Sequence, residues 1–485
     1  MDRPDKAQKR VCPVSRKCGG CQLMNLPYAD QLRLKQALVN KLMRPFGKPA
    51  FIIGMDDPFH YRCKVQAAFS TTRGGQIVAG VYRAGTHTVV KTDGCLIENE
   101  TADAIVDTVR RLLPRFHLTA YDEDSGRGFL RHVLVRVGWR TGQLLVVPVT
   151  AVPDFPCKEE FVEALLKAHP QITSIVQNIN PGHTSMVLGE RETVLYGPGY
   201  IEDELCGCRF RLSPRSFYQV NPAQTEILYQ KAVAFAGLSG GERVLDAYCG
   251  VGTIGLVAAR SGASVVGVEV NADAVRDARV NAALNGAENA EFLCADAGDY
   301  MTAAAERGER FDVVFTDPPR AGCSRAFLNA LATLAPAKIV YISCNPATLA
   351  RDLHTLQKSG YAVKKIQPVD MFPYTRHVET VVQLSKGNIS SQNVRVEFSL
   401  EDMDMSRFQQ GATYEQIQDW VQEKYGFHVT HLNIAQVKRK HGIIERENYN
   451  KPKSPDPRQP GCPEDKIKAI EEALKAYKMI SEICG

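Results

Sequence analysis

The sequence lacks the long apolar runs that mark membrane proteins. No stretch reaches the roughly 18 uninterrupted apolar residues of a membrane-spanning helix, so we expect no membrane partner. The first ten residues, MDRPDKAQKR, are charged and no apolar segment follows them, so we expect no secretory signal and a cytoplasmic protein. Internal repeats and long low-complexity runs are also missing, which excludes a repeat architecture.

The absence of an export signal makes the 14 cysteines informative. In a reducing compartment we expect no disulfide framework, because intracellular cysteines bind metal, do chemistry or pack as small apolar residues. The net charge of +5 is too small to indicate nucleic-acid binding. Residues 1–48, however, carry eleven Lys and Arg against three Asp, which suits either a phosphate backbone or a solvated surface.

The composition is that of a globular protein, with 44% hydrophobic and 23% charged residues, and the length of 485 residues suggests about three units. Residues 1–50 contain a cysteine cluster followed by a helix, predicted from Leu34, Leu38 and Leu42 at four-residue spacing on one face. Residues 51–207 read as a mixed α+β region with strands near 132–139 and 144–149. Residues 389–485 form a polar extension with helices of its own.

Residues 208–388 alternate strands and helices in a different way. The runs ERVLDAYCG, ASVVGVEVN, FDVVFTDPP and KIVYISCNP are each apolar and end in small or polar residues, with Ala- and Leu-rich helical stretches between them. This alternation predicts an α/β fold with a parallel, doubly wound sheet.

A glycine-rich turn follows the first of these strands. In VLDAYCGVGTIGL (244–256), Gly250, Gly252 and Gly255 permit a tight turn and a close approach of the backbone to a ligand. Glu269 stands nineteen residues after Gly250, at the end of the next strand, where it could accept hydrogen bonds from a ribose. This spacing alone would fit a dinucleotide equally well.

Three acidic residues favour S-adenosyl-L-methionine as the ligand. Asp246 ends the first strand, where it could hold an ammonium group, and Asp296 follows the third strand, where it could meet an adenine. Asp317 begins a DPP motif after the fourth strand, which is common in methyltransferases that act on bases. The ends of parallel strands near a reversal of strand order form the usual ligand site. The alternative without a ligand is that the glycines only cap a helix and the acidic side chains are solvated.

Cys344 ends the apolar strand KIVYIS on the same predicted sheet edge. A lone cysteine in such a place is more often a core residue than a nucleophile. Its position before a helix nevertheless predicts a lowered thiol pKa, because a helix N-terminus stabilises negative charge.

The motifs DPPR (317–320), SCNP (343–346) and HVETVVQL (377–384) together resemble the RNA uracil-5-methyltransferase family, and most closely its 23S ribosomal RNA branch with an iron–sulfur cluster. The resemblance extends from about residue 12 to 385. It implies a Rossmann-like S-adenosylmethionine-dependent methyltransferase domain at 208–388, an N-terminal cluster-binding segment at 1–50, and a central α+β RNA-binding domain at 51–207. The small helical C-terminal extension at 389–485 is outside it, and its role stays unknown.

The resemblance also implies a mechanism and site residues. Uracil C5 is a poor nucleophile until a thiolate adds at C6, and a base must then remove the C5 proton. The family places the nucleophile on Cys344 and the base on Glu379, a role that burial would favour by raising the carboxyl pKa. It further implies that Gln219, Tyr248 and the backbone at Thr253 line the cofactor pocket, although relatives often carry Asn at the last of these positions.

Cys12, Cys18 and Cys21 have the spacing C-x5-C-x2-C, with Cys95 as a candidate fourth ligand. Four thiolates suit either an iron–sulfur cluster or structural zinc, and the spacing does not choose between them. The resemblance implies [4Fe-4S], with the role of folding the basic N-terminal segment into an RNA-binding surface. Cys63 is a rival fourth ligand, but its surroundings read as a strand interior.

The expected partner is RNA, most closely 23S ribosomal RNA, with the target uracil in a loop or flipped out. A uracil in the T loop of transfer RNA, a DNA amino-methyltransferase and a non-catalytic RNA-binding assembly factor are the alternatives. A monomer is the default expectation. Many relatives begin with an oligonucleotide-binding barrel, whereas here Cys12 comes at once. In the extension, a helical face with Trp420 precedes the basic run Lys438–Lys440, which predicts a packing module or, more faintly, a helix-turn-helix.

Overall fold

The structure is a computed structural model that describes residues 12–83, 85–182, 186–387, 414–441 and 462–476. The chain divides into two compact units, residues 1–390 and 391–485, and each has a hydrophobic core of its own. No helix in these described ranges combines the length and the apolar character needed to cross a bilayer.

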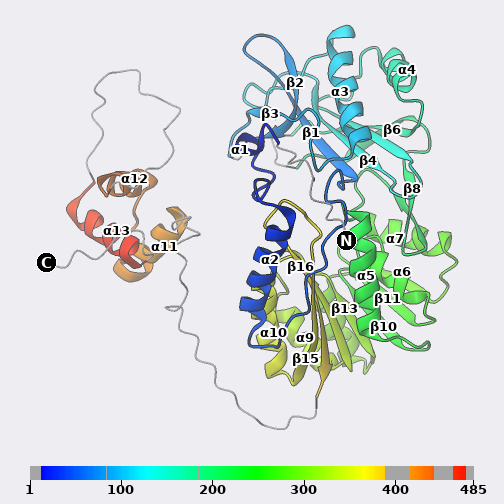
Figure 1. The fold of residues 1–485 in the computed structure, drawn as a ribbon, viewed down its shortest axis with the longest axis vertical. Coiled ribbons are helices and arrows are strands. Elements are labelled where there is room, and N and C mark those ends of the chain that lie inside the picture. Colours follow the sequence, from blue (N-terminus) through cyan, green and yellow to red (C-terminus); the bar gives the residue numbers. More distant parts are fainter. Residues whose placement is uncertain (1–11, 84, 183–185, 388–413, 442–461, 477–485) are drawn as a thin grey trace, which may run out of the picture. The chain divides into compact units, whose positions relative to one another are not determined.

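The C-terminal half of the first unit contains a seven-stranded sheet with the order β12-β11-β10-β13-β14-β16-β15 (Figure 1). Strands β10 to β14 are parallel, and β16 pairs antiparallel with both β14 and β15. The chain runs outward from β10 to β12 and returns to β13 on the other side of β10, so the strand order reverses there. The predicted doubly wound sheet is therefore confirmed, with an antiparallel addition. Its strands are β10 (Arg243–Ala247), β11 (Ser264–Glu269), β12 (Ala290–Cys294), β13 (Val313–Thr316), β14 (Lys338–Ser343), β15 (Tyr361–Val369) and β16 (Glu379–Lys386).

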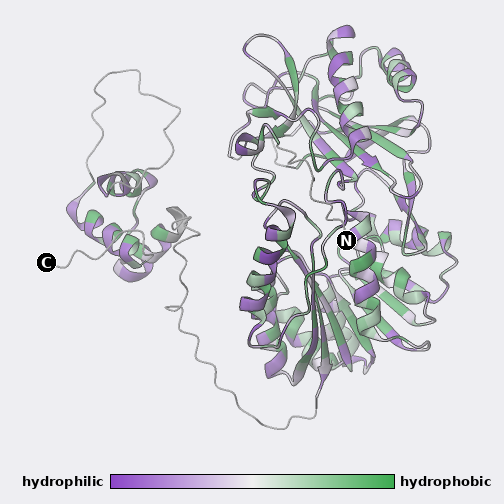
Figure 2. Ribbon diagram, viewed as in Figure 1, coloured by the Kyte–Doolittle hydropathy of each residue, from purple (hydrophilic) through white to green (hydrophobic). Residues whose placement is uncertain are grey.

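Both faces of this catalytic sheet are covered by helices, which explains why the inner residues of its central strands are mostly apolar (Figure 2). Val244 and Val313 point to one face and pack with α5, α6 and α7, whereas Leu245 and Val314 point to the other and pack with α8, α9 and α10. The helices are α5 (Pro222–Ala236), α6 (Thr253–Ala259), α7 (Ala272–Leu284), α8 (Ala297–Glu306), α9 (Arg325–Leu334) and α10 (Pro346–Lys358).

The N-terminal half of this unit contains a second seven-stranded sheet, with the order β3-β2-β1-β4-β5-β6-β7. All neighbours are antiparallel except β5 and β6, which are parallel and joined through α4. Its elements are β1 (Lys64–Thr71), β2 (Ile77–Tyr82), β3 (Val89–Lys91), α3 (Glu100–Arg115), β4 (Leu130–Val137), β5 (Leu144–Thr150), α4 (Lys158–Ala168), β6 (Ile172–Ile179) and β7 (Arg191–Tyr196). The strands predicted near 132–139 and 144–149 are β4 and β5.

The two sheets of the first unit share a core. Helices α3 and α4 cover one face of the central sheet, while Leu134, Leu145 and Val176 on the other face join the core of the catalytic sheet. The hairpin of β8 (Ile201–Leu205) and β9 (Cys208–Leu212) contributes to this shared core. The boundary predicted between residues 207 and 208 thus falls at the turn of one hairpin.

The predicted N-terminal helix is confirmed as α2 (Tyr28–Met43), which follows the short α1 (Ser15–Cys18) and packs beside α10 (Figure 1). Its predicted packing face is wrong, because Leu34 and Leu38 are 46% and 42% exposed. The buried face instead consists of Gln31, Lys35, Val39 and Met43. Polar contacts of Gln31 and Lys35 turn this face, and not the leucines, towards the core. The spacing of the leucines does not reveal these contacts.

The second unit consists, in its described residues, of α11 (Tyr414–Tyr425), α12 (His431–Lys440) and α13 (Glu464–Ala476) around one small apolar core. The helical face with Trp420 lies on α11, and the basic run Lys438–Lys440 lies in the last turn of α12. Lys438 is only 3% exposed and Lys440 forms an ion pair with Glu471 at 3.1 Å, while the side chain of Arg439 lies outside the described residues. These contacts favour the packing module.

Candidate active site

Acidic side chains and one thiol meet at one edge of the catalytic sheet. Glu269 ends β11, Asp317 follows β13, Cys344 follows β14, and Glu379 begins β16. Because β16 runs antiparallel to β14 and Ser343 pairs with Thr380, the adjacent residues Cys344 and Glu379 are brought side by side. This edge coincides with the reversal of strand order at β10 and β13, where open α/β sheets bind ligands.

The glycine-rich turn has the geometry that its residues predict. Gly250 and Gly252 have φ angles of 55° and 82°, in the left-handed region that glycine adopts without strain. A Cβ on Gly252 would lie 2.7 Å from the Phe292 ring, so packing also requires glycine there. Tyr248 adopts a φ of 65° despite its side chain, and its ring lies 5.1 Å from that of Phe327. Such a conformation in a non-glycine residue is common at functional sites.

Asp246 is fully buried with one carboxylate oxygen satisfied. The Gly255 N–H donates to its Oδ2 at 2.8 Å, whereas Oδ1 has no hydrogen-bond partner among the described residues. Burial, together with the carboxylates of Asp317 and Glu269, raises the pKa of Asp246 to about 7. Burial likewise raises the pKa of Asp317 to about 7. A bound cation would relieve this concentration of negative charge, and S-adenosylmethionine carries both a sulfonium and an ammonium group.

The other predicted cofactor residues have different local environments. Glu269 accepts hydrogen bonds from the N–H groups of Gly250 at 3.2 Å and Asn271 at 2.9 Å, which fixes its carboxylate at the turn. Asp296 is exposed and caps α8, since it accepts from the Gly298 N–H at 2.8 Å. Thr253 begins α6, and its hydroxyl lies 3.3 Å from that of the buried Tyr229. Gln219 is partly exposed in the segment between β9 and α5.

Glu379 and Cys344 both have raised pKa values. Glu379 is 4% exposed, and burial, reinforced by Asp317, raises its pKa well above the ordinary value, as a base near neutrality requires. Burial, Glu379 and Asp317 also raise the pKa of the Cys344 thiol to about 11, with Arg320 opposing them. The predicted lowering of this thiol pKa is therefore wrong. Helix α10 begins after Cys344, and the side chain of Asn345 accepts its Ala347 N–H at 3.1 Å.

Arg320 is a residue near this pair whose role the sequence did not reveal. Its positive charge lowers the pKa of both Cys344 and Glu379, and its Nη1 lies 3.5 Å from Nε2 of His377. The DPPR motif marked its position, but a motif does not show which way a side chain points.

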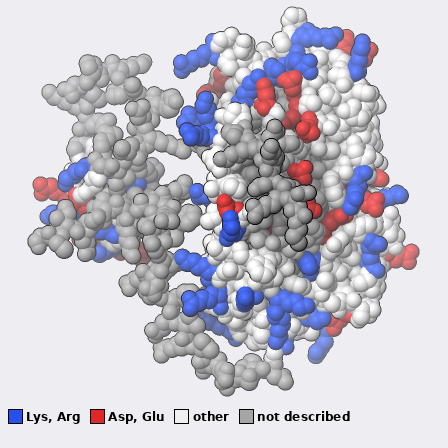
Figure 3. All heavy atoms as spheres, in the orientation of Figure 1, with Lys and Arg blue, Asp and Glu red and all other residues white. Residues whose placement is uncertain are grey.

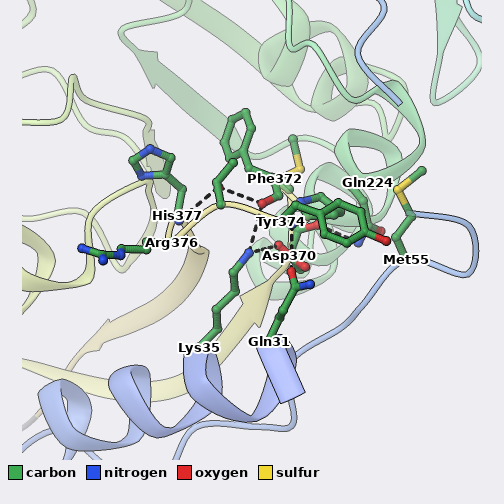
Figure 4. A network of polar contacts seen from close by, with 12 residues as sticks. Gln31, Lys35, Met55, Gln224, Asp370, Phe372, Tyr374, Arg376 and His377 are labelled. Carbon is green, nitrogen blue, oxygen red and sulfur yellow. Dashed lines mark hydrogen bonds and ion pairs between the residues drawn. The ribbon is translucent and has the colours of Figure 1, made fainter. Parts of the chain in front are cut away.

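A second set of residues that was missed lies in the loop 370–378, which leads from β15 to Glu379 (Figure 4). The buried Lys35 Nζ donates to Asp370 Oδ1 at 2.5 Å and to the Phe372 carbonyl at 3.0 Å. Gln224 Nε2 of α5 donates to the Asp370 carbonyl at 3.0 Å. The catalytic edge is therefore held by residues far away in the sequence.

Three of the four predicted ligand cysteines, Cys12, Cys21 and Cys95, contact one small apolar cluster that includes Tyr61 and Tyr374. Cys18 lies near Cys12. Burial raises the pKa of the Cys18 thiol most, the Gly20 amide lowers it, and the charge of Cys12 raises it a little further. Burial raises the pKa of Cys21 and of Cys95 to about 12. In the described ranges, no three His, Cys, Asp or Glu side chains are close enough to hold a metal ion. Cysteine thiolates are thus suitable ligands for a metal or an iron–sulfur cluster, although the described thiols are not close enough together to enclose a metal ion.

Cys63 does not join this group. It is buried directly before β1, where its N–H donates to the Val220 carbonyl at 2.8 Å, and burial together with Asp203 raises its pKa to about 12. Cys95 is accordingly the better placed fourth thiol.

Comparison with known proteins identifies the class to which this fold and site belong. The solved structure of the Pyrococcus abyssi tRNA (uracil-54, C5)-methyltransferase in complex with S-adenosyl-L-homocysteine is similar, with a TM-score of 0.64 and 30% identity over 77% of this chain and 87% of that one. The chain has the Rossmann-like fold of S-adenosylmethionine-dependent methyltransferases, and S-adenosylmethionine is its cofactor.

Sequence relatives narrow the class to a family. A family model described as tRNA (uracil-5-)-methyltransferase matches residues 190–387. An uncharacterized RNA methyltransferase of Halalkalibacterium halodurans is 43% identical over 390 residues, which cover 79% of this chain and 85% of the relative. One of Clostridium acetobutylicum is 41% identical over 396 residues, covering 80% and 86%. The chain belongs to the RNA uracil-5-methyltransferase family and is an RNA methyltransferase.

Proposed function

We propose that this protein methylates C5 of a uracil in 23S ribosomal RNA, with Cys344 as the nucleophile and Glu379 as the base. The observation that carries the proposal is the pairing of Ser343 with Thr380, which sets a thiol and a buried carboxyl side by side at the ligand edge of the sheet. The pKa of Glu379 is raised, as expected of a group that must accept a carbon-bound proton near neutral pH.

The residues perform the reaction in three steps. Cys344, as the thiolate, forms a bond from Sγ to uracil C6, and the C5–C6 π electrons move to O4 as an enolate. Bound S-adenosylmethionine supplies the methyl group that C5 then takes. Glu379 removes the C5 proton, the double bond between C5 and C6 re-forms, and the bond between C6 and Sγ breaks.

The unsatisfied Oδ1 of Asp246 supports the cofactor assignment, because an ammonium group is the partner that a buried, half-paired carboxylate accepts. In the strand order, Asp317 is the cofactor acid next to Cys344 and Glu379. Its negative charge raises the pKa of Asp246, of Cys344 and of Glu379. Positive charge placed there by the cofactor would lower the pKa of Cys344 and favour the thiolate. In this proposal the cofactor acids are Asp246, Glu269, Asp296 and Asp317, with Gln219, Tyr248, Gly250, Gly252 and Thr253 around them.

We assign a [4Fe-4S] cluster to Cys12, Cys18, Cys21 and Cys95. The thiolate chemistry of the four cysteines supports this assignment, and three of them contact one small apolar cluster. Protein purified without oxygen should contain iron and sulfide and absorb visible light. Cys95→Ser should lose that iron, whereas Cys63→Ala should keep it, and zinc in place of iron would overturn the assignment.

Charge alone does not define how RNA is held. Figure 3 shows Lys and Arg side chains over the upper and lower parts of the first unit on the face in view, with Asp and Glu among them. Within the basic N-terminal segment, Lys35 is buried in an ion pair and Arg33 pairs with Asp30, while residues 1–11 lie outside the described ranges. The choice of ribosomal RNA is supported by the cysteine set, whose spacing resembles that branch of the family.

Transfer RNA is the second candidate substrate, because the similar Pyrococcus abyssi enzyme is named for uracil 54 of tRNA. The deciding experiment is to map 5-methyluridine across total RNA from cells with the protein, without it, and with Cys344→Ala. The proposal is supported if 5-methyluridine disappears from 23S RNA both in cells without the protein and in cells with Cys344→Ala. Loss from transfer RNA alone selects the second candidate. An unchanged map would overturn both and leave a DNA amino-methyltransferase or a non-catalytic assembly factor.

A further inference from the structure

The loop 370–378 determines where the proposed base lies. It joins β15 to β16, and its two flanking residues, Val369 and Glu379, are partners in the antiparallel ladder. Glu379 is therefore the first residue after a closed loop, and the loop sets how the chain enters β16 at that residue.

This loop is held from the N-terminal segment of the chain. The Leu23 N–H donates to the Tyr374 carbonyl at 2.9 Å, and the Tyr374 N–H donates to Gln31 Oε1 at 2.9 Å. The Tyr61 hydroxyl donates to the Pro373 carbonyl at 3.1 Å. Tyr374 has a φ of 66°, so these contacts hold a backbone conformation that a tyrosine seldom adopts by itself.

Lys35 and Asp370 form the buried ion pair of the network in Figure 4. The side chain of Lys35 is 2% exposed and that of Asp370 is 0% exposed, and the Asp370 Oδ2 accepts a second hydrogen bond from the Tyr28 hydroxyl at 2.9 Å. Lys35 Nζ also donates to the Phe372 carbonyl, two residues further along the loop. Two side chains at the start of α5 hold the preceding residues of the loop. Gln224 donates to the Asp370 carbonyl at 3.0 Å, and Asn221 donates to the Met371 carbonyl at 2.9 Å.

A buried ion pair is a costly way to fill this space. Apolar residues of the same volume are often as stable or more stable, so such a pair is retained where it specifies one arrangement. The same helix leaves Leu34 and Leu38 in solvent while it buries Lys35, although the reverse would bury more apolar area. The rotation of α2 is thus explained by the loop that it holds.

We propose that Lys35 is a positioning residue for Glu379, acting through Asp370 and the Phe372 carbonyl to hold the loop 370–378. The inference rests on the proposed function of Glu379. Cys344 follows β14 and lies outside the loop, so Lys35 serves removal of the C5 proton and not the addition of the thiolate or the transfer of the methyl group.

The test is Lys35→Met, which keeps the length of the side chain and removes its charge. We expect kcat to fall by about 100-fold, as for a group displaced by about 1 Å, with the KM for S-adenosylmethionine unchanged. Methyl transfer in a single turnover should persist, so a covalent enzyme–RNA adduct that carries the labelled methyl group should accumulate on a denaturing gel. Glu379→Gln is the benchmark for that adduct.

The matched control is Arg131→Met in the central sheet. Arg131 is also buried and paired, with Glu123 at 2.8 Å, so its loss destabilises the fold in the same way without touching the loop. It should show no adduct. Gln31→Ala removes the acceptor of the Tyr374 N–H without leaving a buried charge, and should show the adduct in smaller amount.

An unchanged kcat in Lys35→Met would overturn the inference, as would a fall in which methyl transfer declines in parallel and no adduct forms. Should that variant fail to fold, Lys35→Met with Asp370→Asn removes the uncompensated carboxylate, and it must then show the adduct. Wild-type protein that forms neither 5-methyluridine nor any adduct through Cys344 would instead refute the proposed function.

Discussion

The two halves of the catalytic edge are built in different ways. The half with the acids that we propose bind the cofactor, called the cofactor half below, runs from β12 to β13. It takes those acids from strand ends and turns that follow one another along about 70 residues of chain. Asp246 accepts one hydrogen bond from Gly255, and Glu269 accepts from Gly250 and Asn271, all of them local partners. The strand pattern and the glycine spacing are sufficient to place these groups.

The half that carries the proposed base, Glu379, depends instead on distant segments. Asp370 is paired with Lys35, and the Tyr374 N–H with Gln31, which are 335 and 343 residues away in sequence. Contacts of this kind form only when the N-terminal segment has docked on the sheet. Under the proposed roles, cofactor binding and proton removal should therefore be separable by substitution, since the two sets of residues are held by different parts of the chain.

The largest expected separation comes from Cys344→Ala. We expect methylation to fall by about 10⁴-fold or more, because the proposed covalent step then has no nucleophile. S-adenosylmethionine should bind with unchanged affinity, since Cys344 lies outside the cofactor half. Isothermal titration together with a tritium-transfer assay measures both quantities. Residual turnover within tenfold of wild type would refute the covalent mechanism.

The same contrast explains what could be predicted from the sequence. Asp317, Cys344 and the glycine turn were placed correctly at one edge because parallel strands end together, so the motif positions predict the sheet edge. The packing face of α2 was predicted wrongly, because its leucines suggested one face while the partners of Lys35 lie near the other end of the chain.

The pKa of Cys344 could not be predicted for a related reason. The helix that follows it is visible in the sequence, but burial of the thiol and the carboxylates of Glu379 and Asp317 are consequences of tertiary packing. They outweigh the helix terminus, which acts only over its first turn and is capped here by Asn345.

Asp246→Asn should impair the cofactor half alone. The substitution removes a negative charge from a buried site, and a charge-assisted hydrogen bond contributes about 1.5–3 kcal/mol, so S-adenosylmethionine should bind about 10–100-fold more weakly. At saturating cofactor the adduct chemistry of Cys344 should persist. Equilibrium titration and kcat at saturation separate the two effects. A lower kcat with unchanged cofactor affinity would place Asp246 in the chemical step.

Cofactor affinity should also depend on pH. Burial raises the pKa of Asp246 and of Asp317 to about 7, so below that pH both carboxyls hold protons and neither attracts a cation. Binding the cationic cofactor favours the ionised forms and releases protons. Affinity should therefore increase with pH, by about tenfold between pH 6 and pH 8, and level off above. Titrations in buffers of different ionisation enthalpy detect the released protons, and Asp246→Asn should flatten the profile.

The smallest effect is expected in the central sheet, where Lys64 of β1 stands directly opposite Arg136 of β4. Burial, Arg136 and Arg62 lower the pKa of Lys64 from 10.5 to about 8, and the groups that act on it are cations. Like charges at facing positions of an antiparallel ladder destabilise it. Lys64→Met should therefore raise the melting temperature by about 1–2 °C at pH 7 and low salt.

The sign of this effect follows from the proton balance. Between pH 8 and 10.5 the unfolded chain binds a proton at Lys64 that the folded chain releases, so wild-type stability increases with pH in that window. The gain from Lys64→Met is then complete below pH 8 and shrinks as the pH rises towards 10.5. Lys91→Met is the control, because Lys91 of β3 pairs with Asp93, and its loss should not stabilise the protein. A lower melting temperature for Lys64→Met would mean that Lys64 has a stabilising partner in the fold, and the central sheet would then be held together by charge, as the loop before Glu379 is.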